Sequence, residues 1–240
     1  MLFRSVASAI QNAALVQLER QERFVRDTFG RYLSDDVVAR LLGEPDGLDL
    51  GGESRELTIL MSDLRGFTQL CESLQPAQVV ALLNNYLGAM TEVIHRYQGT
   101  IDEFIGDGIM VIFGAPVPQH DHADRAIACA LEMQLAMTAV NEWNAAEGLP
   151  SIGMGIGLAT GVAIIGNIGS TKRAKYGAVG STVNLASRVQ SYTLIGQVLV
   201  DETTRRVAQA LLRIDSSFKM RLKGFDGQRE LSVVGDIGAP

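Results

Sequence analysis

Residues 100–113 read TIDEFIGDGIMVIF, in which two short apolar runs flank the tripeptide Gly106-Asp107-Gly108. An Asp-Gly turn between two apolar runs is typical of a β-hairpin, so we expect strands over 100–105 and 109–113. On either side of this hairpin, apolar residues recur at helical spacing over 76–97 and 123–144. These two segments predict long helices, the first of them with one wide apolar face.

The rest of the chain predicts an α+β fold, in which helices pack on a mainly antiparallel sheet. Alternating apolar residues over 152–160 and 162–168 predict two paired strands that meet at Gly161. The run 172–175, with three cations in four residues, predicts a solvated loop. The other expected elements are strands over 56–62, 197–200 and 229–234 and helices over 184–192 and 203–212.

The first 52 residues are expected to precede the main domain, which then covers 53–240. Residues 1–28 carry apolar side chains at roughly helical spacing. They predict an amphipathic helix, which is either the end of a coiled coil or a helix packed on the domain. The segment 29–52 holds a lead-in helix that begins at Ser34, followed by a linker rich in glycine. The first helix suggests that a signal arrives from an upstream sensor domain or partner.

The composition excludes several classes of protein. With 21 basic and 27 acidic residues, the formal net charge is −6, which disfavours a nucleic-acid binder because the chain repels phosphates. Cys71 and Cys129 are too few for a disulfide framework, and we expect both to be small buried hydrophobes. No segment has the apolar length of a membrane span or the pattern of a signal peptide, so we expect a soluble, cytoplasmic protein.

Two aspartates are candidates for binding a divalent cation. Asp63 follows the expected strand over 56–62 and precedes a helix start at Gly66-Phe67-Thr68, where backbone N–H groups favour phosphate. Asp107 lies at the hairpin tip. If the two elements are neighbours in the sheet, both carboxylates converge on one point and suit Mg²⁺ or Mn²⁺. Taken singly, each aspartate is explained better as a helix cap or a turn residue.

Asn184 and Arg188 are four residues apart, so they project from one face of the expected helix. A planar guanidinium beside an amide suits a charged, oxygen-rich transition state, although a solvated helix face explains the pair equally well. Lys223 is a basic residue at a turn and carries no signal of its own. We interpret HDHADR at 120–125 as the start of a helix at Asp121 or His122 rather than as a metal site.

Together these residues resemble the catalytic domain of the class III nucleotidyl cyclases. The resemblance covers roughly residues 29–234. It implies a ferredoxin-like βαββαβ core and a head-to-tail homodimer with two active sites at the interface. The matching strings are FGRYLSDDVVARLL at 29–42, SDLRGFT at 62–68, FIGDGIMVIFGAP at 104–116, GNIGS at 166–170, VGSTVNLASR at 179–188 and LKGF at 222–225.

The resemblance also implies roles for single residues. Asp63 and Asp107, with the backbone carbonyl of Leu64, would hold two divalent metal ions (Mg or Mn) on one chain. The amides from Gly66 through Phe67 to Thr68 would cradle the triphosphate. The implied reaction is attack of the ribose 3′-hydroxyl on the α-phosphorus with loss of pyrophosphate. One ion would activate the hydroxyl, and both would stabilise the in-line transition state.

Three more roles would fall to the other chain of the dimer. Asn184 would orient the ribose, Arg188 would stabilise charge on the α-phosphate, and Lys223 would grip the terminal phosphates. The chain departs from the family at Ser181, where the usual residue is Asp. We expect this change to alter local loop bonding more than the chemistry.

Glu103 and Gly177 occupy the positions that select the purine in this family. Adenylate cyclases typically carry Lys at the first position and Asp or Thr at the second, whereas guanylate cyclases resemble this chain in having Glu at the first. Guanine presents N1–H and the N2 amino group side by side, and one carboxylate accepts from both. Adenine instead presents an acceptor at N1. Because Gly177 has no side chain, selectivity falls mainly on Glu103, unless Glu103 is merely an exposed strand residue.

We therefore predict a homodimeric guanylate cyclase that makes cyclic GMP from GTP with two divalent metal ions. Within the same class, the alternative is an adenylate cyclase or an enzyme of loose specificity. From another class, the alternative is a non-catalytic module that binds nucleotide or only dimerises.

Overall fold

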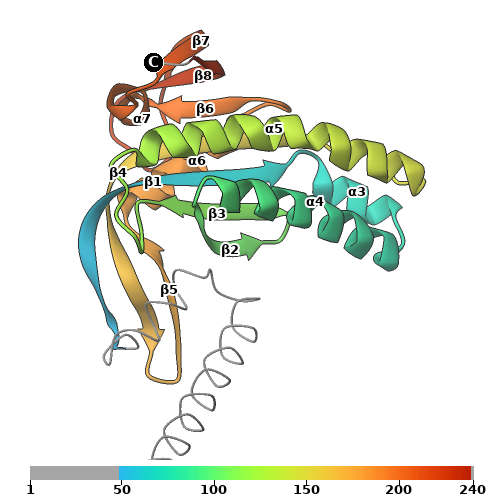
Figure 1. Ribbon diagram of the computed structural model, residues 1–240, viewed down its shortest axis with the longest axis horizontal. Coiled ribbons are helices and arrows are strands. Elements are labelled where there is room, and N and C mark those ends of the chain that lie inside the picture. The colour runs from blue at the N-terminus through green and yellow to red at the C-terminus, as the bar shows by residue number, and fades with distance from the viewer. Residues whose placement is uncertain (1–48, 239–240) are drawn as a thin grey trace, which may run out of the picture. The chain divides into compact units, whose positions relative to one another are not determined.

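The computed structural model describes residues 49–238, and those from Leu50 onward belong to one compact unit of the chain (Figure 1). The helices expected over 1–28 and from Ser34 therefore lie outside the described residues. The helices are α3 (Phe67–Ser73), α4 (Pro76–Arg96), α5 (His122–Ala146), α6 (Ser181–Ser191) and α7 (Glu202–Val207). The strands are β1 (Gly51–Leu64), β2 (Thr100–Ile105), β3 (Gly108–Phe113), β4 (Met154–Ser170), β5 (Arg173–Val179), β6 (Val198–Asp201), β7 (Leu211–Met220) and β8 (Arg229–Gly238).

All eight strands form one sheet in the order β2-β3-β1-β4-β6-β8-β7, and β5 pairs with β4 off this path. The pair β4–β6 is parallel, and the other paired strands are antiparallel. The expected α+β fold with a mainly antiparallel sheet is thus confirmed. Hydrogen bonds along β1, β3 and β4 hold the central strands in one register, which fixes where each strand ends.

Helices cover both faces of the sheet. Figure 1 shows α4 and α5 side by side across one face, where they share a buried cluster with Leu60 of β1. Leu57 and Ile59 point to the other face and pack with α6. Burying one such side chain contributes about 1.5–3 kcal/mol to the free energy of folding. Because β1 is covered on both faces, its apolar residues run without alternation.

The hairpin expected from the sequence forms between β2 and β3, which pair in antiparallel fashion. The two residues between the strands are Gly106 and Asp107, so the turn is Gly-Asp rather than the expected Asp-Gly. Gly106 takes φ of 65°, a left-handed conformation that glycine adopts without strain. The turn places the Asp107 side chain at the tip of the hairpin.

The two strands expected around Gly161 are instead one continuous strand, β4, so this prediction is wrong. Gly161 does not form a turn. It allows α6 to pack closely on β4, because a Cβ atom there would lie 2.9 Å from Thr182 Oγ1 on α6. The expected loop at 172–175 is also wrong, since β5 begins at Arg173 and pairs with the far half of β4. Exposed cations are tolerated on β5 because it is the outer strand of the arm that it forms with β4, whose other side pairs with the start of β1 (Figure 1).

The helix expected over 203–212 is shorter than predicted. Asp201 accepts hydrogen bonds from the backbone N–H groups of Thr203 and Thr204, and α7 then ends at Val207. Residues 211–220, which the sequence analysis did not interpret as a strand, form β7 and pair with β8. Pairing with β8 makes this segment a strand, and the spacing of its apolar residues alone does not indicate that pairing.

Three smaller expectations have mixed outcomes. Helix α5 begins at His122 with Asp121 at its N-cap position, as expected, although the Asp121 side chain makes no capping bond. Cys129 is buried, whereas Cys71 is only partly buried. Between residues 49 and 238, no helix is both long enough and apolar enough to cross a membrane.

Candidate active site

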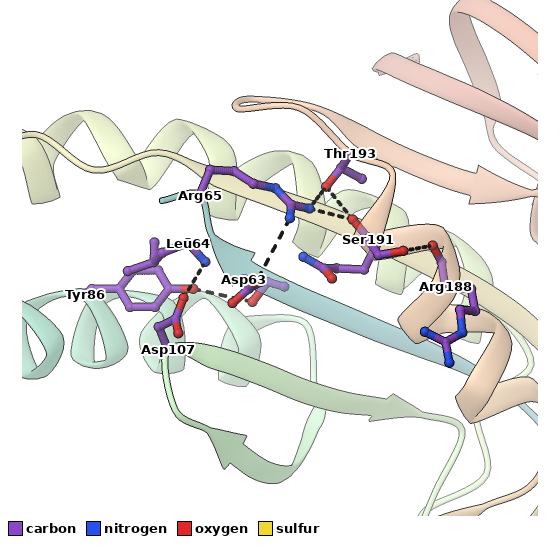
Figure 2. A network of polar contacts seen from close by, with 10 residues as sticks. Asp63, Leu64, Arg65, Tyr86, Asp107, Arg188, Ser191 and Thr193 are labelled. Atoms are coloured by element: carbon purple, nitrogen blue, oxygen red, sulfur yellow. Dashed lines mark hydrogen bonds and ion pairs between the residues drawn. The ribbon is translucent and has the colours of Figure 1, made fainter. Parts of the chain in front are cut away.

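Asp63 and Asp107 meet at one end of the sheet. Asp63 is the penultimate residue of β1, and Asp107 is at the tip of the hairpin whose strand β3 pairs with β1. The backbone N–H of Leu64 donates a 3.0 Å hydrogen bond to Asp107 Oδ2, which ties the hairpin tip to the end of β1 (Figure 2). Both aspartates line an open cavity of about 340 Å³. The expected convergence of the two carboxylates is therefore present.

The electrostatics of this pair favour a cation. Burial, together with the hydrogen bond and charge of Asp107, raises the pKa of Asp63 to about 6. Arg65 opposes this shift only weakly, because its Nη1 lies 3.9 Å from Asp63 Oδ2. Two adjacent carboxylates fit Mg²⁺ or Mn²⁺, which bind oxygen ligands. In the described part of the chain, no third His, Cys, Asp or Glu joins them, so other ligands would come from water, backbone or substrate.

The loop after β1 continues the same cavity. Gly66, Phe67 and Thr68 all line it. Gly66 takes φ of 75° at the N-cap of α3, and no side chain caps this helix start. Backbone N–H groups at an uncapped helix start favour an anion.

Arg65 is a member of the site that the sequence analysis missed. Its Nη2 donates a 2.5 Å hydrogen bond to the carbonyl oxygen of Gln190 on α6 and also contacts Thr193 Oγ1. Gly155 makes room for this contact, because a Cβ atom there would overlap Thr193 Oγ1. Arg65 thus anchors the loop after Asp63 to the end of α6, a contact between residues too far apart in sequence for a local pattern to reveal.

Asn184 and Arg188 lie on α6, as expected, and both are exposed. Figure 2 shows the Arg188 side chain on α6 lying apart from Asp63 and Asp107, with no contact drawn to either. Lys223 is exposed in the turn between β7 and β8. One chain by itself therefore does not bring Arg188 to the paired carboxylates.

Glu103 is accessible on β2, and its carboxylate has a partner that the sequence analysis missed. Lys175 Nζ on β5 lies 2.9 Å from Glu103 Oε2 and 2.8 Å from Asp102 Oδ2. Gly177, which the family resemblance assigns to the second purine position, is two residues further along β5 and is buried against Asp102. The structure thus places Glu103 and Gly177 around the same ion pair.

The model of the family described as "Adenylate and Guanylate cyclase catalytic domain" matches residues 52–234. The chain belongs to this family. It contains a class III nucleotidyl cyclase catalytic domain, and the strings SDLRGFT and FIGDGIMVIFGAP carry the two aspartates that the structure brings together.

Solved and curated members of the family carry both substrate names. The guanylyl cyclase Cya2 is 48% identical, with a TM-score of 0.78 over 80% of this chain and 97% of that one. The adenylyl cyclase CyaB from P. aeruginosa is 33% identical, with a TM-score of 0.73 over 78% and 97% of the two chains. "Adenylate cyclase 1" of Rhizobium meliloti is 36% identical over 68% of this chain, which spans 24% of that protein's length. Family membership therefore establishes the class of cyclase and leaves the purine to be argued from the site.

Proposed function

We propose that this domain is a guanylate cyclase, which converts GTP to 3′,5′-cyclic GMP and pyrophosphate as a homodimer with shared active sites. The observation that carries the proposal is Glu103, whose carboxylate is about half exposed at the purine position. A carboxylate accepts from guanine N1–H and the N2 amino group together, whereas it faces the N1 lone pair of adenine. The similarity to the guanylyl cyclase Cya2 supports the same choice.

Asp63, Asp107 and the backbone carbonyl of Leu64 would hold two divalent ions in this reaction. When bound, these ions would activate the ribose 3′-hydroxyl and neutralise charge on the phosphates. The carboxylate of Asp107 is already oriented by the Leu64 N–H, so little rearrangement is needed for it to bind a cation. The N–H groups of the 66–68 segment would bind phosphate oxygens at the start of α3.

The second protomer would supply the remaining groups. Asn184 would orient the ribose, Arg188 would stabilise the charge that develops on the α-phosphate, and Lys223 would bind the terminal phosphates. The 3′-oxygen forms a bond to the α-phosphorus as the bond to the bridging oxygen breaks, and that oxygen leaves with pyrophosphate. The separation of Arg188 from Asp63 within one chain supports a site completed by another chain (Figure 2).

An apolar patch on the arm supports the same assembly. The patch consists of Val162, Ile164 and Val179, which are between 43% and 57% exposed. Ile164 and Val179 are direct cross-strand neighbours, so the patch is continuous over the two strands. Exposed apolar side chains that cluster in this way are typical of a surface that binds another protein. The partner proposed for this patch is a second copy of the domain.

Turnover of GTP and ATP, assayed in parallel with Mg²⁺ and with Mn²⁺, tests the function. We expect kcat/KM for GTP to exceed that for ATP by about 10-fold to 100-fold, because a mismatched polar edge costs about 1–3 kcal/mol. Faster use of ATP would make the protein an adenylate cyclase. No turnover, with dimerisation retained, would favour a non-catalytic module.

The substitution Glu103→Lys should lower kcat/KM for GTP about 10-fold to 100-fold, because an ammonium opposes the guanine donors and leaves them unpaired. It should also reduce the ratio of kcat/KM for GTP to kcat/KM for ATP. Glu142→Lys, which makes the same charge change at an exposed position on α5, is the matched control and should leave the ratio unchanged. An unaltered GTP/ATP ratio in Glu103→Lys would refute the assignment of the purine position.

Metal binding should depend on pH through Asp63. Because the pKa of this carboxyl is raised to about 6, it is ionised at pH 7.5 and largely protonated at pH 5. Without metal, the raised pKa of Asp63 in the folded state lowers the free energy of unfolding above pH 6. This loss of stability disappears as the pH falls toward 3.8, the usual pKa of the group. Mn²⁺ should therefore raise the Tm clearly at pH 7.5 and much less at pH 5, since protons compete for the ligand. Equal Tm shifts at both pH values would contradict the role of Asp63.

A further inference from the structure

Strand β2 contains an irregularity at the purine position. Its pairing with β3 shifts register between Ile101 and Glu103, so Asp102 is the extra residue of a bulge. Successive residues of a regular strand point to opposite faces of the sheet. Here the side chains of Asp102 and Glu103 both reach Lys175 Nζ, at 2.8 Å and 2.9 Å. The bulge therefore turns a second carboxylate toward the same ammonium group.

The two carboxylates differ in their surroundings. The Asp102 side chain is 1% exposed, whereas those of Glu103 and Lys175 are 45% and 46% exposed. Burial raises the pKa of Asp102, and the hydrogen bond and charge of Lys175 oppose this shift. Among residues 49–238, Asp102 Oδ1 has no hydrogen-bond partner. The backbone N–H of Ala178 stabilises the ionised form less than Lys175 does, and a carboxylate this deeply buried is costly to keep in a fold.

Gly177 is shaped to the same carboxylate. A Cβ atom at position 177 would overlap Asp102 Oδ1 and lie 3.3 Å from Lys175 Cε. Asp102 thus fills the space that a side chain at the second purine position would need. The absence of a side chain at Gly177 and the presence of a buried carboxylate at Asp102 are two parts of one arrangement.

We propose that Asp102 is a positioning residue of the purine pocket, which holds Lys175 beside Glu103 and gives that ammonium a second anionic partner when Glu103 binds guanine. This inference rests on the proposed function. With one ammonium between two carboxylates, the group carries a net charge of −1. If Asp102 were neutral, Lys175 would pair with Glu103 alone, and guanine would have to break a neutral ion pair to reach the Glu103 carboxylate.

The substitution Asp102→Asn, alone and with Lys175→Met, tests this role. Asn keeps the shape of the side chain and loses its charge. We expect Asp102→Asn to raise the KM for GTP about 5-fold to 10-fold, with kcat within about twofold, because Lys175 then competes more strongly for Glu103. Adding Lys175→Met should return this KM to within about twofold of the wild-type value. Asp215→Asn is the matched control, since Asp215 pairs with Arg213 on β7 at the opposite edge of the sheet.

A purely structural role gives a different result. It predicts a lower Tm in Asp102→Asn and in the double variant with Lys175→Met. It also predicts that the KM for GTP of the double variant stays as high as that of Asp102→Asn. Such a result, or an unchanged KM in Asp102→Asn, overturns the inference. If the wild-type protein still prefers GTP, the proposed function remains intact. A wild-type preference for ATP refutes the proposed function, and the inference falls with it.

A second substitution covers the case in which Asp102→Asn does not fold. In Gly177→Ala the added Cβ should displace Asp102 from Lys175, and the same rise in KM for GTP should follow. Lys175→Met should again reverse it. A Gly177→Ala chain with an unchanged KM, or one that Lys175→Met does not restore, overturns the inference.

Discussion

The Asp107→Ala chain is expected to turn over GTP at least ~10³-fold more slowly than the wild type, a loss of about 4 kcal/mol of transition-state stabilisation. The substitution removes one of the two carboxylates that meet at the end of β1, and Asp63 alone binds a divalent ion far more weakly. It also removes the acceptor of the Leu64 N–H, so the hairpin tip loses one tether. Steady-state turnover, Tm and the oligomeric state are measured on the same preparations.

Asp107→Asn separates the two consequences. The amide oxygen still accepts the hydrogen bond of Leu64, while the negative charge is lost. We expect Asn to keep the wild-type Tm within a few degrees and to lose turnover almost as fully as Ala. If either variant retains turnover within tenfold of the wild type, Asp107 does not hold a metal ion.

The acidic pair was predictable because both aspartates lie beside strong local signals. Asp63 ends an apolar run, and Asp107 lies in a turn between two apolar runs, so strand pairing alone was enough to bring them together. The long helices α4 and α5 were equally clear, since their apolar residues recur over more than 20 positions. Local pattern and tertiary packing agree in these elements.

The proposed purine pocket around Glu103 was predictable only in part. Lys175 and Asp102 are 73 residues apart and meet through a bulge in β2 and the arm formed by β4 and β5. The cations of the arm were interpreted as a loop because their charge says nothing about pairing with β4. Bulges shift one residue and leave the hydrophobic pattern almost unchanged, so a single sequence does not reveal which of two adjacent acids is turned inward.

The same limit applies to Arg65. Its partners Gln190 and Thr193 follow it by more than 120 residues, and its guanidinium ties the loop of the acidic pair to the helix that carries Arg188. Arg188 itself lies apart from that pair within one chain (Figure 2). In the proposed homodimer, each chain therefore contributes its acidic pair to one active site and its Asn184 and Arg188 to the other.

Mixing two inactive variants should therefore restore activity. Asp107→Ala and Arg188→Ala are each expected to be inactive as homodimers, because every site lacks one essential group. In a mixed dimer, one site combines the intact Asp107 of one chain with the intact Arg188 of the other. Random exchange makes half of the dimers mixed, each with one working site of two, so an equimolar mixture should reach about a quarter of wild-type turnover. Co-purification of differently tagged chains shows that the subunits have exchanged. If such a mixture stays inactive, each site is built within a single chain.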